Sequence, residues 1–215
     1  PRVAGRDILL IDRPEATQSQ IRVAQATMAR TDPAWPALAV GNAVLGGAFS
    51  SWLNDEIRVK RGLAYGIDSH LVARRAGATF EVATATRNEK VIESLGLALD
   101  LTARMQKEGM REEDAAAGRS YLAGLAPLRI ESPDALAAAL VQRRLLGLDP
   151  AGFVRFPEEL RAVRLDDANS AVRRGLPGED RAVVVVGPAA ALKEPLGRYG
   201  KVTVRPAAWV VDGGR

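Results

Sequence analysis

Residues 45–68 constrain the fold more than any other part of this chain of 215 residues. Within a few positions the pattern runs from a glycine turn through a short helix to a strand. The turn is Gly46-Gly47, because glycine tolerates a positive φ. Ser50 or Ser51 follows as an N-cap, since a hydroxyl can accept a hydrogen bond from a free backbone N–H. The pattern therefore predicts a helix that starts immediately after a tight turn.

This predicted helix ends at a corner that carries two polar side chains. Leu53 and Ile57 are four residues apart and share one helix face, which we expect to be buried. Gly62 stands where a C-cap glycine belongs, and an apolar strand follows it. Arg58 and Tyr65, seven residues apart, therefore lie on either side of the helix-to-strand corner. We expect both side chains to be at least partly exposed, because neither belongs to the buried face.

The corner resembles a segment of the C-terminal, non-catalytic half of the M16 zinc peptidases, the pitrilysin and insulinase family. That segment has the form L-R-x-x-x-G-L-A-Y, and residues 57–65 here read Ile-Arg-Val-Lys-Arg-Gly-Leu-Ala-Tyr. The resemblance implies that Arg58 and Tyr65 hydrogen-bond a peptide substrate near its scissile carbonyl, at the zinc site of a partner half. Arginine offers a fixed set of donors and a permanent charge, and a phenol offers one donor. Such donors can form an oxyanion hole.

The same resemblance implies that Gly46, Gly47 and Ser51 contribute to substrate binding. The chain departs from the family pattern at Trp52, because family members often have Ser-Arg-Leu where this chain has Ser-Trp-Leu. A second interpretation of the corner stays open. Residues 58–61 can form a solvated helix end whose basic side chains complement the helix dipole.

The chain lacks the residues that a zinc site needs. His70 is its only histidine, and it has no cysteine. Protein zinc sites take three or four ligands, and catalytic ones draw heavily on histidine. In the catalytic half of the family the corresponding helix carries H-x-x-E-H. The helix expected over residues 33–45 has neither His nor Glu. We therefore expect no metal in this chain, and the resemblance implies zinc in the partner half.

The remaining patterns predict an α+β fold. Polar and apolar residues alternate at 18–26 and 78–85, as in half-buried antiparallel strands, and the apolar run 181–186 predicts a central strand. Asn88 is the expected N-cap of a helix that reaches Gly109, and Ser132 or Asp134 that of a later helix whose apolar face holds Val141 and Leu145. We expect an antiparallel β-sheet covered by helices on one face, similar to the LuxS/metallohydrolase-like sandwich of M16 half-domains. Further strands are expected at 7–12, 65–72 and 201–205.

We expect residues 1–215 to form a single domain with its core at about 7–206. Pro1 in place of an initiator Met indicates a processed product or a piece of a longer protein. The resemblance implies that the catalytic half is an upstream domain or a separate subunit, and that this chain alone hydrolyses nothing. A half that has lost its partner should expose an apolar or mixed surface and could self-associate. The alternative is a non-catalytic structural subunit, similar to the core proteins of respiratory complexes.

Composition and charge exclude some functions and leave the compartment open. The net charge of +4 is dispersed along the chain, so we expect no nucleic-acid binding. No apolar run is long enough to span a bilayer, and these residues contain no signal-peptide pattern, although the signal of an exported parent would have been left off. Arginine greatly outnumbers lysine and alanine is abundant, which is typical of a GC-rich bacterial genome. The absence of cysteine fits both the bacterial periplasm and the cytoplasm.

Overall fold

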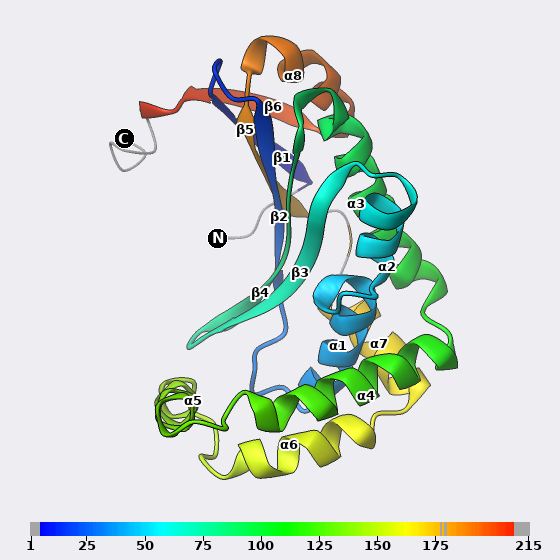
Figure 1. Ribbon diagram of the computed structural model, residues 1–215, viewed down its shortest axis with the longest axis vertical. Helices are drawn as coiled ribbons and strands as arrows, with labels where there is room; N and C mark the ends of the chain where they lie inside the picture. Colours follow the sequence, from blue (N-terminus) through cyan, green and yellow to red (C-terminus); the bar gives the residue numbers. More distant parts are fainter. Residues whose placement is uncertain (1–4, 177, 179, 209–215) are drawn as a thin grey trace.

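The computed structural model describes residues 5–176, 178 and 180–208, and these form a six-stranded sheet with helices packed against one face (Figure 1). The α+β class is thereby confirmed. The strands are β1 Arg6–Asp12, β2 Gln18–Thr27, β3 Ala64–Arg74, β4 Gly77–Arg87, β5 Arg181–Gly187 and β6 Lys201–Pro206. The helices are α1 Trp35–Asn42, α2 Trp52–Asn54, α3 Val91–Glu108, α4 Glu112–Leu128, α5 Pro133–Leu145, α6 Gly152–Arg161, α7 Leu165–Gly175 and α8 Ala189–Leu196.

The sheet is mixed, which corrects the expectation of a wholly antiparallel sheet. Its strand order is β3-β4-β2-β5-β1-β6. The β2–β4, β3–β4 and β2–β5 pairs are antiparallel, whereas β1 runs parallel to both β5 and β6. The physical reason is the crossover through α8, which connects β5 to β6. A crossover of this kind lets β6 pair with β1 in the same direction as β5. The predicted central strand, β5, lies inside the sheet as expected, and β6 forms one of its edges.

The core lies between the sheet and the helices. Phe80 of β4, Leu38 of α1 and Leu95 of α3 are among its fully buried side chains. Helix α3 buries the face that its spacing predicts, because positions three and four apart lie on one side of a helix. Against this face packs a short helix formed by α2 and the π-helical segment Asp55–Lys60, which carry Leu53 and Ile57, both with no exposed surface. The core therefore fixes the position of the helix-to-strand corner.

Asn88 has a different role from the predicted one. It does not cap the helix that follows, and its side chain bonds instead to the β1–β2 turn and to strand β2. Its Oδ1 accepts a hydrogen bond from the Ser19 hydroxyl at 2.8 Å, and its Nδ2 donates to the Ala16 carbonyl at 2.7 Å. An amide has both a donor and an acceptor, so it can join two backbone segments where a cap uses only the acceptor. Asn88 thereby ties the start of α3 to the sheet.

Helix α5 forms where it is predicted but does not bury its apolar face. Ser132 caps it, since its Oγ accepts a hydrogen bond from the Ala135 N–H at 3.2 Å. No residue of α5 is buried, and Val141 and Leu145 are well exposed. Figure 1 shows the reason, because α5 lies beyond the tip of the β3–β4 hairpin, away from the covered face of the sheet. Leu128 and Val154 on the neighbouring helices are also exposed, which leaves an apolar surface at this end of the molecule.

Candidate functional site

The site begins at the glycine pair, whose role differs from the predicted one. Gly46 and Gly47 belong to a π-helical turn, Ala43–Gly47, and neither has a positive φ. A Cβ at Gly46 would lie 2.6 Å from Ser69 Oγ and 2.7 Å from a methyl group of Leu53. A Cβ at Gly47 would lie 2.7 Å from the Asn42 amide nitrogen. The glycines therefore serve close packing between the end of α1 and strand β3, rather than a left-handed turn.

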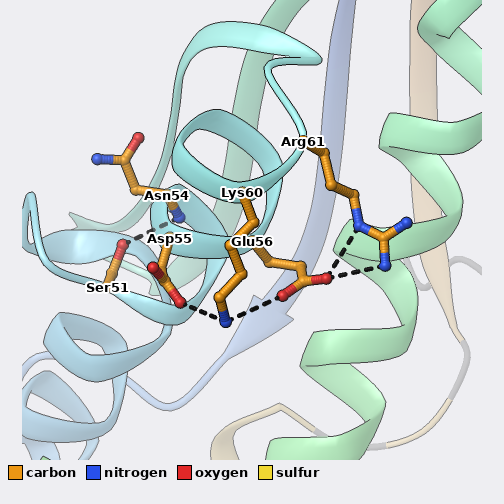
Figure 2. Close-up of polar contacts among 6 residues, drawn as sticks. All are labelled: Ser51, Asn54, Asp55, Glu56, Lys60 and Arg61. Atoms are coloured by element: carbon orange, nitrogen blue, oxygen red, sulfur yellow. Dashed lines mark hydrogen bonds and ion pairs between the residues drawn. The ribbon is translucent and has the colours of Figure 1, made fainter.

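A serine and an asparagine then fix the start of the short helix (Figure 2). Ser51 Oγ accepts a hydrogen bond from the Asn54 N–H at 3.5 Å, which confirms Ser51 as the N-cap. The Asn54 amide donates to the Phe49 carbonyl oxygen at 2.6 Å. Both polar side chains are buried, so their hydrogen bonds hold the turn without competition from water. The backbone at Phe49 is thus fixed relative to the helix.

The charged side chains at the end of this helix form ion pairs (Figure 2). Lys60 Nζ lies 2.8 Å from Asp55 and 3.4 Å from Glu56. Arg61 lies 2.9 Å from Glu56, and its hydrogen bond is the main reason that the pKa of Glu56 is lowered. Exposed pairs of this kind add little to stability. Lys60 and Arg61 thus have acidic partners, whereas Arg58 has none among the described residues.

Arg58 instead contacts two aromatic rings. Its guanidinium carbon lies 4.7 Å from the centroid of the Phe49 ring and 5.1 Å from that of the Tyr65 ring. Such cation–π contacts orient a guanidinium without consuming its N–H donors. Arg58 is half-buried, whereas Tyr65 is 90% exposed and Phe49 is 71% exposed. The structure therefore brings Arg58 and Tyr65 together at one corner, with donors that are free to meet a ligand.

The corner turns as the sequence predicts. Gly62 ends the helix with φ of 58°, a conformation that suits glycine, and nothing lies within 4 Å of where its Cβ would be. A bulge between Ala64 and Ile67 then shifts the pairing of β3 with β4. Bulges re-aim the side chains beside them. Tyr65 lies within this bulge, which explains how a residue of an otherwise paired strand is so exposed.

Phe49 is the site residue that sequence reasoning missed. A large apolar side chain in a turn, with polar or small residues on either side, has no helix face or strand face to cover it. This is the signal that could have found it. Trp52, where the chain departs from the family pattern, packs under Arg104 of α3, whose guanidinium carbon lies 5.2 Å from the centroid of the Trp52 ring. A direct contact of Gly46, Gly47 or Ser51 with substrate stays a prediction.

His70 lies on the exposed surface of β3, where its Nε2 contacts the Asp68 carboxylate two residues away. Over residues 5–176, 178 and 180–208, no group of three His, Asp or Glu side chains is arranged to hold a metal ion. Within the same ranges none of the helices combines the length and apolar character needed to cross a membrane.

These features define a class of architecture: an α+β domain with a mixed six-stranded sheet, covered by helices on one face, that presents an arginine and a tyrosine at an exposed corner. Comparison with known families identifies it further. The family model described as the peptidase M16 inactive domain matches residues 1–122, more than half of the chain. The chain belongs to this family.

Two relatives are similar along most of the chain. An uncharacterized zinc protease of Streptomyces coelicolor is 29% identical over 187 residues, which cover 87% of this chain and 40% of that protein. The crystal structure of a peptidase M16 inactive domain from Pseudomonas fluorescens is 27% identical, with a TM-score of 0.79 over 87% of this chain and 44% of that one. This chain thus spans less than half the length of either relative.

A third comparison shows the fold alone. A chain of complex III2 from Candida albicans is 12% identical, with a TM-score of 0.76 over 92% of this chain and 50% of that one. A shared architecture does not decide function, which has to be argued from the site.

Proposed function

We propose that this chain is the substrate-binding, non-catalytic half of a zinc-dependent M16 endopeptidase. In this proposal Arg58 and Tyr65 donate hydrogen bonds to a peptide substrate at the zinc site of a partner half, and the domain closes the chamber that holds the peptide. The partner is an upstream domain or a separate subunit. The observation that carries the proposal is the Arg58–Tyr65 pair, in which Arg58 is half-buried and Tyr65 is exposed, and neither has an acidic partner among the described residues.

The chemistry of the pair suits this role. Arg58 keeps its charge at every physiological pH, and its planar donors fit a carbonyl oxygen that gains negative charge. Tyr65 adds one neutral donor from the adjacent strand. Contact with the Phe49 ring restricts the orientations of the Arg58 guanidinium, so less conformational entropy is lost when substrate binds. Zinc in the partner half would polarise the carbonyl and activate water, and this chain would supply only the hydrogen bonds.

A structural subunit is the second candidate, and the fold shared with a chain of complex III2 favours it. A scaffold has no use for a cationic side chain held over two exposed rings. The two candidates therefore differ in what happens to peptide cleavage when the corner is altered.

The test is to produce this chain together with the partner half that the proposal requires, a half that carries H-x-x-E-H. We expect cleavage of a fluorogenic peptide only when both halves are present, because the metal and the hydrogen-bond donors lie on different halves. Neither half alone should exceed about a hundredth of the combined rate, because losing even one oxyanion-hole donor usually costs about 100- to 1000-fold. A catalytic half that is fully active alone would contradict the proposal and favour the structural subunit.

The exposed ring of Phe49 gives a second, smaller effect. Phe49→Leu keeps an apolar side chain but removes the ring from Arg58, and a cation–π contact at an exposed site contributes about 0.5–1 kcal/mol. We expect kcat to fall about two- to fivefold in the assembled protease, with little change in stability. Phe49→Tyr keeps the ring and should retain activity. Equal rates for the leucine and tyrosine variants would show that the ring does not orient Arg58.

A further inference from the structure

A cavity of about 780 Å³ lies away from the Arg58 corner, where the loop between β2 and α1 meets α5, α6 and α7. None of the corner residues lines it. Its wall is partly apolar, with Phe156, Val163 and Ala171 among the lining side chains. It also contains four arginines and four carboxylates, Arg30, Arg143, Arg155, Arg174, Asp32, Asp149, Glu159 and Asp167. The way in which these charges pair decides what the cavity can bind.

Two of the arginines are neutralised within the protein. Arg174 lies 2.7 Å from Asp32, and Arg155 lies 2.5 Å from Asp149. The hydrogen bond from Arg155 is the main reason that the pKa of Asp149 is lowered. These two pairs therefore leave two carboxylates and two arginines of the lining without a salt bridge among the described residues. The carboxylates, Glu159 and Asp167, are exposed at the rim, where water solvates them.

Arg30 is one of the two arginines without an acidic partner. Its guanidinium carbon lies 4.6 Å from the centroid of the Phe156 ring and 5.3 Å from that of the Trp35 ring. The rings hold the cation in place, and no carboxylate of the described residues is within ion-pair distance of it. Burial lowers the pKa of Arg30 to about 10, with the nearby charge of Arg143 as the second cause. A half-buried cation is thus held at the cavity wall with its in-plane N–H donors unused.

Arg143 is the second arginine of the lining without a salt bridge in the described part of the chain. Its Nε donates to the Asp149 carbonyl oxygen at 2.8 Å, which leaves the two terminal nitrogens without an acceptor among the described residues. A Cβ at Gly152 would lie 2.0 Å from one of those nitrogens, so the glycine makes room for the guanidinium. Arg30 of the β2–α1 loop and Arg143 of α5 therefore face one cavity, and their charges repel each other, an effect on Arg30 that the charge of Glu159 only partly offsets.

We infer that this cavity is a binding site for a carboxylate carried on an apolar body, with the carboxylate between Arg30 and Arg143. Guanidinium groups bind carboxylates through paired N–H donors, and a single negative charge would relieve the repulsion between the two arginines. The two rim carboxylates disfavour a doubly charged phosphate. The apolar wall suits the rest of the ligand. A peptide C-terminus and a free aliphatic acid share this chemistry.

The test measures binding to the whole chain by titration calorimetry with four probes. They are acetyl-trileucine with a free C-terminus, the same peptide as its amide, hexanoate and inorganic phosphate. We expect the peptide acid to bind about tenfold more tightly than its amide, the effect of one charge-assisted hydrogen-bonded pair. Hexanoate binding as tightly as the peptide acid would identify a free acid as the ligand, and much weaker hexanoate binding would identify a peptide terminus. Equal binding of acid and amide, or phosphate as the tightest ligand, would overturn the inference.

Variants connect the binding to the two arginines. Arg30→Met should weaken binding of the tightest carboxylate probe about tenfold or more, while Arg75→Met, on the exposed β3–β4 turn outside the cavity, should leave it unchanged. Arg143→Met provides an independent result if Arg30→Met does not fold, because Arg143 packs on the surface of α6. Unchanged affinity in whichever of these two variants folds would refute the site, even if the chain proves to be an M16 peptidase half.

Discussion

Replacing Tyr65 with phenylalanine is expected to lower the kcat of the assembled protease about 100- to 1000-fold, the usual cost of removing one oxyanion-hole donor. The change keeps the ring that contacts Arg58 and deletes only the phenolic O–H. Because Tyr65 is almost wholly exposed in this chain, the free energy of unfolding should stay within about 0.5 kcal/mol of the wild type. Steady-state cleavage of a fluorogenic peptide and urea unfolding of the same preparations measure the two effects.

A matched control separates this role from a general effect of losing a phenol. Tyr121 of α4 is also exposed, at 41%, and does not belong to the corner. Tyr121→Phe should leave both cleavage and stability unchanged. Near-normal cleavage by the Tyr65 variant, or an equal loss in both variants, would remove Tyr65 from the proposed site.

Arg58 should act on the same step as Tyr65, the stabilisation of the negative charge that develops on the substrate carbonyl. Arg58→Lys keeps the positive charge but loses the planar set of donors, so it should recover only part of the activity that Arg58→Ala loses. If both residues stabilise one developing charge, the losses of Arg58→Ala and Tyr65→Phe should not add in the double variant. Simple additivity would indicate two independent contacts with the substrate.

The local structure of this corner could be read from the sequence because short-range rules determine it. The Ser51 cap, the buried pair Leu53 and Ile57, and the C-cap at Gly62 each depend on neighbours within a few positions, and each is found. The expected exposure of Tyr65 also follows from such rules. These features need only the chain geometry of one helix end and one strand start.

The features that sequence reasoning did not reach depend on contacts between distant residues. Strand β1 pairs with β5 across more than 160 residues, and nothing local specifies that they run parallel. The glycine pair indicates a turn, but the need for close packing appears only when Ser69 of β3 is placed beside it. Helix α5 has an amphipathic pattern, and a pattern does not say whether anything covers its apolar face. The Arg30 cavity likewise combines segments that lie more than 100 positions apart.

The second large effect concerns the packing beneath the corner. Leu53→Ala should lower the free energy of unfolding by about 2–5 kcal/mol, the range for truncating a buried leucine. Leu53 has no exposed surface, and it packs so closely on the π-helical turn that a Cβ at Gly46 would meet its methyl group at 2.7 Å. The backbone of Gly46 and the core side chains around it are held by the sheet and cannot readily close the cavity that alanine would leave. Urea unfolding followed by circular dichroism measures the change.

Val59 provides the matched control for this prediction, because it lies on the same helix but is 66% exposed. Val59→Ala should change the free energy of unfolding by no more than about 0.5 kcal/mol, as surface substitutions usually do. The contrast follows from the helix geometry, in which Leu53 and Ile57 point to the core while Val59 points to solvent. If Leu53→Ala cost no more than Val59→Ala, the short helix would not be anchored by this face. The position of Arg58 would then have to depend on the surface ion pairs and on the Phe49 and Tyr65 rings alone.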